Sequence, residues 1–528
     1  MPVRGTPPPP LSINGHRIVN AESGNPVALR GLNWFGFNVG MGMVDGLWAG
    51  GTEAATDFAL ITYQIRLLGY NAVRLPFTWK DLEMPPKVLD KDCSPVNVNF
   101  LKRRLISPNV MEKYISKPLP GNVSPQKKMK AGYCNQYLPQ KSNYHRLFFV
   151  VQSLIAQGIY VVLDYQPMGL EQHPYDLKLF VDKWTDLWRQ VACLPNFDAD
   201  LANRVFVDVM NEPDSMGVRW EASGGRPGAQ QLYLSTADSI WQTTPNKVMF
   251  MFEGEGGGRE ARRLGFGGEL RRRHGSWAGL GSEGVTGEGA AEEQRLLGWG
   301  LREGGTSPCM ALRVVDRALS GFGLNWGNGF VTDQEVIRNR GLSDVTPFFN
   351  ELLTKSYVNK VVITPHVYPP TITHATFLGT TLWDQCRTAF GYLQDKGFCP
   401  ASGGDCKVFP ILIGETGSAF ETSDDKQWLQ DFADYMNAEG EAAKYTSVPV
   451  NGWNWWAYNE NSGDTGGIVY HYWQDINWAK VNFMVARFGL RPWYLRWESA
   501  QAAASDARCS LHWTPWSLML LPGCCILQ

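Results

Sequence analysis

The chain has 528 residues, a formal net charge of −2 and 19% charged residues. This length allows one large barrel with additions, or two to three ordinary domains. The nearly neutral charge argues against a nucleic-acid-binding protein, which normally carries a basic patch. No run of about 18 apolar residues occurs, so the sequence predicts no transmembrane helix and no membrane partner.

Residues 1–10 and 496–528 differ from the rest of the chain. The stretch MPVRGTPPPP has no apolar signal-peptide segment, and its proline run resembles the end of an interdomain linker. We therefore expect residues 1–10 to be the linker remnant of a truncated protein. Residues 496–528 lack periodicity and are expected to form an irregular tail. The final CILQ matches a prenylation box, but no polybasic segment precedes it, so no lipid anchor is expected.

Strand-like and helix-like segments alternate between these ends. A hairpin in the stretch INGHRIVNAESGNPVALR leads into the first of eight predicted strands. Apolar residues at helical spacing precede three later strands, at 58–68, 147–155 and 177–191. The strands are expected at 27–34, 71–77, 159–165, 204–212, 247–254, 360–368, 408–415 and 450–458.

The alternation itself predicts the fold class. Continuous apolar strands separated by helices are typical of a parallel sheet covered on both faces. Eight such units predict an α/β fold, a (β/α)8 TIM barrel with its active site at the C-terminal strand ends. A doubly wound open sheet is the competing architecture, although no GxGxxG motif follows an early strand. We expect the catalytic domain to span residues 11–495.

One segment inside this domain departs from the pattern. Residues 254–312 are rich in Gly, Arg and Glu, as in GEGGGREARRLGFGGELRRRHGSW. Such a composition cannot bury much apolar surface, so we expect a disordered insertion after the fifth strand. A retained intron or a gene-model error would also account for this segment.

The ten cysteines show no CxxC-type metal spacing. Cys399 and Cys406 bracket a short Gly-rich loop and could form a disulfide, as could Cys93 and Cys134. Disulfides would suit an oxidising compartment, but the pairing of cysteines cannot be read from the sequence.

Carboxylates at predicted strand ends are the most informative residues for function. Glu212 ends the fourth strand, Glu253 the fifth and Glu415 the seventh. In a barrel these ends converge, and two carboxylates about 5–5.5 Å apart can hydrolyse a glycosidic bond with retention. For Glu253, which glycines follow, a solvated strand end is the favoured interpretation.

Other polar and aromatic side chains also fall at strand ends. Arg74 ends the second strand, where a guanidinium could keep a carboxylate ionised. Asn211 precedes Glu212 and could hydrogen-bond a sugar hydroxyl. His366, Tyr368 and Trp456 end the sixth and eighth strands, and Trp34, at the end of the first strand, is a second candidate for stacking on a flat sugar face.

These motifs resemble those of glycoside hydrolase family 5, the cellulase-type retaining glycosidases. They occur in the family's order over roughly residues 11–253 and 321–495, and read LRGLNWFGFN, NAVRLPF, DVMNEPDSMG, ITPHVYPP, ILIGETGS and NWWAYNENSGDTGGI. The resemblance implies a (β/α)8 barrel that uses neither a cofactor nor a catalytic metal.

The resemblance also implies a role for each matching residue. Glu212 matches the acid/base, Glu415 the nucleophile and Asn211 the residue that binds the sugar 2-hydroxyl. The groups around the nucleophile are matched by Arg74 and Tyr368, while His366 lines the reaction site and Trp456 is the platform beneath the sugar.

One position departs from the family's pattern. Many members carry a His just after the third strand, where this chain reads VVLDYQPMG and places Gln166. His173, a few residues on, is the candidate that would compensate. Gln can donate to a sugar hydroxyl but cannot become cationic, so this difference bears on substrate-binding detail rather than on the two glutamates.

The sequence therefore predicts an endo-β-1,4-glucanase, with a β-glucan or β-mannan polysaccharide as its partner. An endo-β-mannanase, or another β-glycosidase of the same family, would use the same catalytic residues. A carbohydrate-binding barrel without activity is the alternative from another class. A metal-dependent hydrolase has less support, because only His366 among potential ligands is well placed. We expect an extracellular monomer, although no signal peptide is visible.

Overall fold

The computed structural model describes residues 6–49, 51–89, 91–120, 132–167, 176–255, 327–374 and 376–496. Within them, eight parallel strands form a sheet in the order β10-β9-β8-β7-β4-β3-β12-β11. Parallel bridges from Ile363 to Ile411 and from His366 to Glu415 join its two outer strands, so the sheet closes into a barrel and is not an open doubly wound sheet. The strands are β3 (Leu29–Asn33), β4 (Ala72–Phe77), β7 (Tyr160–Tyr165), β8 (Val205–Asp208), β9 (Met249–Phe252), β10 (Val361–Ile363), β11 (Ile413–Thr416) and β12 (Gly452–Trp455).

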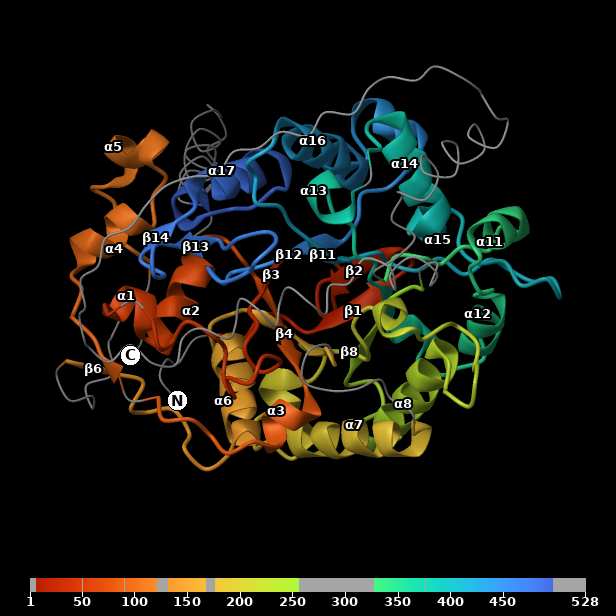
Figure 1. Ribbon diagram of the computed structural model, residues 1–528, viewed down its shortest axis with the longest axis horizontal. Coiled ribbons are helices and arrows are strands. Elements are labelled where there is room, and N and C mark those ends of the chain that lie inside the picture. The colour runs from red at the N-terminus through yellow and green to blue at the C-terminus, as the bar shows by residue number, and fades with distance from the viewer. Residues whose placement is uncertain are drawn as a thin grey trace, which may run out of the picture.

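Helices surround the strands, with α6, α7 and α8 on one side and α16 and α17 on the opposite side (Figure 1). The longer ones are α2 (Phe58–Leu67), α6 (Asn143–Ala156), α7 (Leu177–Ala192), α8 (Ala229–Thr243), α16 (Ser423–Asn437) and α17 (Trp478–Arg487). Shorter ones are α1 (Glu53–Thr56), α3 (Trp79–Glu83), α4 (Val98–Arg104), α5 (Met111–Tyr114), α11 (Gln334–Arg340), α12 (Thr346–Leu352), α13 (Pro370–Thr373), α14 (Thr380–Cys386) and α15 (Tyr392–Asp395). The predicted (β/α)8 barrel is confirmed.

Helix α7 shows how the sequence specifies these elements. Asp176 caps its first turn, because the carboxylate accepts a hydrogen bond of 3.0 Å from the amide of Leu179. The helix then buries Trp184, Trp188 and Val191, which recur at helical spacing along the face turned to the sheet. This buried stripe is the pattern that predicted the helix.

Alternation along the strands divides the barrel interior into layers. Side chains one residue apart point to opposite faces of a strand. In β7, Val162 therefore belongs to the apolar interior, while Val161 and Leu163 pack outward against the helices. The next interior position is Asp164, which is fully buried. In β8, Phe206 lies in the apolar interior, and the next interior position, two residues on, is Asp208. The barrel interior therefore becomes polar toward the C-terminal strand ends.

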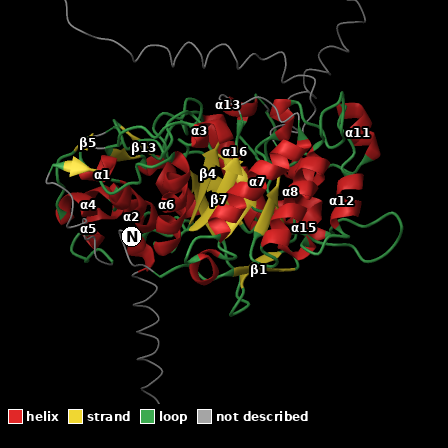
Figure 2. Ribbon diagram, turned by 90° about the horizontal axis from the view of Figure 1, so that it is seen from below, coloured by secondary structure: helices red, strands yellow, loops and turns green. Residues whose placement is uncertain are grey.

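An antiparallel hairpin covers the other end of the barrel. It consists of β1 (Leu11–Asn14) and β2 (Arg17–Asn20), and β1 lies beyond one end of the strands in Figure 2. Leu11 and Ile18 are fully buried and complete the apolar cluster inside the barrel. The hairpin predicted before the first strand is thus confirmed, and it leaves the C-terminal end as the open one.

Residues 8–10, expected to be part of a linker remnant, contact the same end. The carbonyl of Pro8 accepts from Arg204, and that of Pro9 accepts a 2.9 Å bond from the hydroxyl of Tyr160. The carbonyl of Pro10 accepts from the amide of Ala21. These three prolines are therefore fixed to the barrel rather than free.

Both of the disulfides considered from the sequence are present. Cys93 is bonded to Cys134 and Cys399 to Cys406. The first bond joins the region of β5 (Lys91–Asp92) to β6 (Tyr133–Cys134). A further small sheet pairs β13 (Val469–Tyr470) with β14 (Asp475–Ile476).

Most of the predicted insertion, 254–312, lies outside the described residues, as does nearly all of 496–528. Its first two residues are described and correct the predicted boundary. The amide of Gly254 donates to the carbonyl of Gly327 at 2.6 Å, and Glu255 is buried against Trp220 and Ser343. They belong to the packed barrel because these bonds satisfy their polar groups. No helix of the described residues is long and apolar enough to cross a membrane.

Candidate active site

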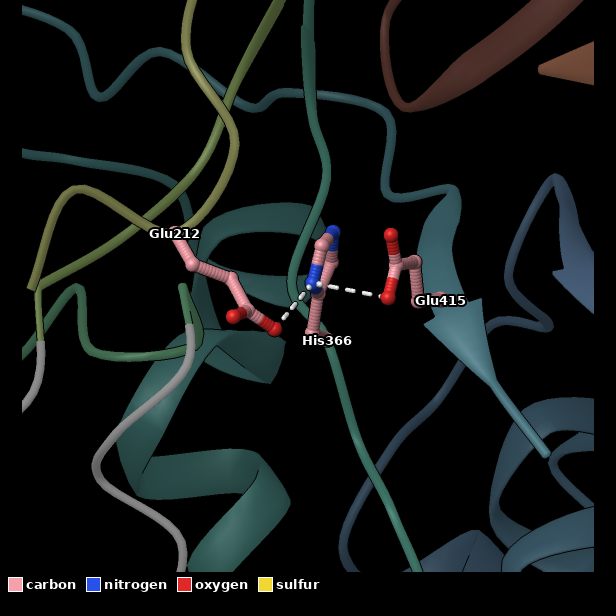
Figure 3. A group of neighbouring side chains, drawn as sticks. All are labelled: Glu212, His366 and Glu415. Atoms are coloured by element: carbon pink, nitrogen blue, oxygen red, sulfur yellow. Dashed lines mark hydrogen bonds and ion pairs between the residues drawn. The ribbon is translucent and has the colours of Figure 1, made fainter. Parts of the chain in front are cut away.

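Glu212 and Glu415 meet at the C-terminal ends of the strands. Glu212 follows β8, Glu415 lies in β11, and His366 lies between their carboxylates (Figure 3). Its Nδ1 is 3.0 Å from Oε1 of Glu212 and 3.6 Å from Oε2 of Glu415. One ligand atom from each of the three residues lies within 4.8 Å of the others. Two carboxylates at this spacing suit the retaining mechanism of glycoside hydrolysis.

Arg74 joins the strand ends beneath these residues. Its guanidinium is fully buried and donates to Glu415, to Asp208 at 3.0 Å and to Glu253 at 2.9 Å. A fourth carboxylate, that of Asp164, lies 3.0 Å away. The planar fork of an arginine can serve several acceptors at fixed directions, which an ammonium cannot do. Arg74 therefore fixes the positions of acidic groups from four other strands or strand ends.

Two more predicted residues contact the same group of side chains. The hydroxyl of Tyr368 donates a 2.6 Å hydrogen bond to Oε2 of Glu415. Asn211 is fully buried and its amide oxygen accepts a 3.0 Å bond from Arg74. The amide nitrogen of Asn211 has no hydrogen-bond partner among the described residues, so it is available as a donor. The structure thus brings six predicted site residues together: Arg74, Asn211, Glu212, His366, Tyr368 and Glu415.

Glu253 is the main correction to the interpretation of the site. A solvated strand end was favoured for it, but its side chain is fully buried. Besides its ion pair with Arg74, its Oε1 lies 3.2 Å from Nε2 of His366. Its Oε2 accepts a 2.6 Å bond from the backbone amide of Glu212. The glycines that follow it suggested exposure, whereas the alternation Met249, Met251, Glu253 indicates an inward position.

The sequence interpretation also missed Asp164 and Asp208. Both are fully buried inside the barrel against Arg74. Their signal was present, since each is a lone carboxylate in an apolar strand, in VVLDY and in VFVD. Burying such a group without a partner is costly, so it indicates a nearby cation. A third missed residue, Asn33 at the end of β3, accepts from Arg74 at 3.2 Å.

Burial and mutual contact keep protons on several of these groups. Burial raises the pKa of Glu212, although the hydrogen bond and charge of His366 oppose this. Burial, against the charge of His366, also raises the pKa of Glu253 to about 8. Burial works against charging His366, but Glu253, Glu415 and Glu212 hold its pKa well above the ordinary value. The site therefore pairs a cationic imidazole with a carboxyl group that tends to stay protonated.

The two predicted aromatic platforms have different outcomes. Trp456 is partly exposed, its amide donates to the carbonyl of Thr416 beside Glu415, and its ring stacks on Phe35 at 5.6 Å between centroids. Trp34 is fully buried, donates to the carbonyl of Asp45 and packs against core aromatic rings. The prediction for Trp34 is wrong, because its ring is fully buried, with Phe58 stacked on it and Tyr458 packed against it, and offers no face to a sugar.

Of the two residues considered after the third strand, the structure describes Gln166 but not His173. Gln166 follows β7 and is buried, and its amide oxygen accepts a hydrogen bond from Asn38. Its backbone amide donates to the carbonyl of Phe77, at the end of the neighbouring strand. His173 lies outside the described residues, so its predicted compensating role stays a prediction.

Two groups within the described residues have the spacing of metal ligands. The first is Glu212, His366 and Glu415, and the second is Asp164, Asp208 and Glu253. Arg74 forms ion pairs with every member of the second group, so its guanidinium already supplies the positive charge there. In the first group, His366 faces both carboxylates and fills the same role.

Comparison with known proteins identifies the family. The model of Cellulase (glycosyl hydrolase family 5) matches residues 127–459, more than half of the chain. The chain belongs to glycosyl hydrolase family 5. It is therefore a glycosidase, an enzyme that hydrolyses O-glycosyl bonds, and the family resemblance found in the strand-end motifs is confirmed.

Two curated relatives match nearly the full chain. The major extracellular endoglucanase of Xanthomonas campestris pv. campestris is 22% identical over 485 residues, covering 90% of this chain and 71% of that protein. An endoglucanase of Paenibacillus polymyxa is 21% identical over 510 residues, covering 93% of this chain and 89% of that protein. Both relatives are endoglucanases by name.

Solved structures show the same fold. A hyperthermophilic endocellulase from the archaeon Pyrococcus horikoshii matches with a TM-score of 0.51 and 19% identity, over 92% of this chain and all of that chain. The complex of the same endocellulase with cellotetraose matches with a TM-score of 0.50 and 18% identity, with the same coverage. At this level of identity the match shows that the two proteins share a fold.

Proposed function

We propose that this family 5 glycosidase is an endo-β-1,4-glucanase that cleaves β-glucan chains by double displacement. The observation that carries the proposal is the pairing of Glu212 and Glu415 on either side of His366, with carboxylate atoms within 4.8 Å. The named activity of the two curated relatives supports the choice of glucan over mannan. The cellotetraose bound by the Pyrococcus enzyme supports a β-1,4-glucan as the class of substrate.

The contacts support a role for each glutamate. Glu415 is the nucleophile, because Arg74 and Tyr368 both donate to its carboxylate and hold it in place. Glu212 is the acid/base, because burial raises its pKa and keeps a proton available. Glu415 attacks the anomeric carbon while Glu212 protonates the departing glycosidic oxygen. Glu212 then removes a proton from water, which displaces Glu415 and releases the sugar with retained configuration.

Two further residues hold the sugar in this scheme. The unpartnered amide nitrogen of Asn211 donates to the 2-hydroxyl of the reacting sugar, a bond that strengthens in the transition state. The partly exposed ring of Trp456 stacks beneath that sugar. Gln166 keeps a role at the edge of the binding site, where its amide nitrogen donates to a hydroxyl group.

We also propose that the enzyme acts outside the cell as a monomer. The Xanthomonas relative is extracellular by name. The two disulfides of this chain suit an oxidising compartment. Detection of the protein in culture medium and light scattering of the pure protein test these two statements.

Reducing-sugar release tests the activity. Wild type should release sugar from carboxymethylcellulose, and Glu415→Gln should lose more than about 1,000-fold of this activity while remaining folded. Sugar release from mannan alone would support the same mechanism but show that the substrate is a β-mannan. A folded wild type that releases sugar from neither polymer would reject the proposal and favour a carbohydrate-binding barrel.

A second measurement distinguishes the roles of the two glutamates. A dinitrophenyl β-cellobioside has a leaving group that needs no proton, so Glu212→Ala should still form the glycosyl-enzyme from it. Azide should then accelerate turnover of Glu212→Ala and give a β-glycosyl azide. The same reagent with Glu415→Ala should give the α-azide. Reversed configurations would exchange the two assignments.

A further inference from the structure

Glu253 touches the machinery around both catalytic glutamates without facing the substrate. Its carboxylate contacts Arg74, His366 and the backbone amide of Glu212, at 2.9, 3.2 and 2.6 Å. The side chain has no exposed surface. From this geometry we propose that Glu253 is a positioning residue for the reaction, which orients Glu212 and His366 and shares Arg74 with Glu415.

The contact with Glu212 acts on the backbone. Glu212 has φ 40° and ψ 66°, a left-handed conformation that is costly for a residue with a side chain. The hydrogen bond from its amide to Glu253 offsets part of this cost. In this conformation the side chain of Glu212 reaches His366. Weakening the bond would allow the chain to relax and would move the acid/base away from the glycosidic oxygen.

The contact of Glu253 with His366 affects the charge of the imidazole ring. Nε2 of the ring faces Glu253 at 3.2 Å, and Nδ1 faces Glu212 at 3.0 Å. A carboxylate near each ring nitrogen favours the positively charged form of an imidazole. The other charged groups near the ring are Glu415 at 3.6 Å, Asp208 on β8 and Arg74 on β4. Glu253 is the partner on the side opposite Glu212, so in its ionised form it favours the charged ring that in turn faces the acid/base.

The contact with Arg74 links Glu253 to the nucleophile. Nη2 of Arg74 donates to Glu253, while Nη1 donates to Glu415. Because the guanidinium is rigid and planar, a carboxylate on one nitrogen limits the rotation that would carry the other nitrogen away from Glu415. Glu253 therefore supports both glutamates, through a different neighbour for each.

Glu253→Gln tests this inference, which rests on the proposed glycosidase activity. The variant keeps the size of the side chain and replaces the carboxyl group, whose pKa is raised to about 8, by an amide that cannot ionise. We expect kcat on carboxymethylcellulose to fall by about 10- to 100-fold with little change in KM, because hydrogen bonds to charged groups are lost outside the substrate-binding surface. The alkaline limb of the activity profile should move up by about one pH unit, because Glu212 loses a cationic neighbour.

Glu255→Gln is the matched control. Glu255 lies two residues further along and is equally buried, but its partners are Ser343, Trp220 and Arg219 rather than catalytic residues. Its removal should lower stability while leaving kcat and the pH profile at wild-type values. Equal kinetics in Glu253→Gln and Glu255→Gln would overturn the inference.

A measurement without substrate separates this inference from the proposed function. In histidine-labelled protein at a pH above about 8, where Glu253 is ionised, the His366 signals should show both ring nitrogens protonated in wild type and a neutral ring in Glu253→Gln. An unchanged ring would overturn the inference even if the enzyme is active. A wild type inactive on every β-glycan would reject the proposed function while this titration still tests the contact. If Glu253→Gln does not fold, Glu253→Asp keeps the charge but shortens the side chain, and a wild-type kcat would overturn the inference.

Discussion

The hydroxyl of Tyr368 donates a hydrogen bond of 2.6 Å to Oε2 of Glu415. Tyr368 follows β10 and Glu415 lies in β11, and the two strands are the pair whose bridges close the barrel. Closure of the sheet is therefore what brings the phenol to the nucleophile. A donor at this position fixes the orientation of the carboxylate that attacks the sugar.

Tyr368→Phe should lower kcat by about 10- to 100-fold, because one hydrogen bond to a charged group is lost. The ring remains to fill the space, so the fold should be unchanged by circular dichroism. Tyr472→Phe is the control, since Tyr472 is 75% exposed. A wild-type kcat in Tyr368→Phe would show that Arg74 alone suffices to hold Glu415.

Arg74→Lys should abolish most activity although it keeps the positive charge. An ammonium cannot serve Asp208, Glu253 and Glu415 in the directions that the guanidinium does. We expect a loss of more than about 100-fold in kcat and a destabilisation of about 3–5 kcal/mol in urea unfolding, because buried carboxylates lose their partner. Arg189→Lys changes an exposed arginine in the same way and should behave as wild type. An active Arg74→Lys enzyme would contradict this role.

The stability of the protein should fall as pH rises from about 5 to about 8. The pKa of Glu253 is raised from its ordinary value to about 8, so the folded state holds a proton that the unfolded state releases in this range. The raised pKa of His366 acts in the same direction at the upper end. The free energy of unfolding of wild type minus that of Glu253→Gln should therefore decrease by on the order of 3 kcal/mol across the range. Urea titrations at each pH measure this difference in the free energy of unfolding. A difference that does not change with pH would contradict the prediction.

The two disulfides should contribute unequally to stability. Cys93–Cys134 closes a sequence separation of 41 residues and Cys399–Cys406 one of 7. Loop-closure entropy predicts that the free energy of unfolding falls by about 4 kcal/mol in the Cys93→Ser/Cys134→Ser variant and by about 2 kcal/mol in the Cys399→Ser/Cys406→Ser variant. Thermal unfolding of both double variants measures this order. Activity below the unfolding temperature should be unchanged, and a larger loss for the shorter loop would contradict the prediction.

Residues 256–326 should be dispensable for activity. The two ends of this segment are held together, because the amides of Gly254 and Glu255 donate to the carbonyls of Gly327 and Gly329. Replacing the segment by a short Gly-Ser linker should therefore leave the barrel closed and keep kcat/KM within about twofold of wild type. A folded but inactive deletion variant would show that the segment takes part in function.

Hydrophobic periodicity along the chain predicted the eight strands and three of the helices, because it depends on neighbouring residues. It also predicted that Glu212 and Glu415 lie at one end of the barrel, whereas Arg74, expected at a strand end, lies within β4. The motifs and their order along the chain were enough to identify the family, because each motif is a short run of consecutive residues.

How the strand ends combine depends on contacts between residues that are distant in sequence. Glu253, Asp164 and Asp208 lie on different strands, and their roles follow from a shared contact with Arg74 that no local pattern contains. The burial of Trp34 likewise depends on Phe58 and Tyr458, which pack against its ring and are distant from it in sequence. The disulfide pairing could not be read from the sequence either, and the structure shows that Cys93 is bonded to Cys134. Contacts between distant residues set the charge and burial of a side chain, and these properties decide whether it can act on a sugar.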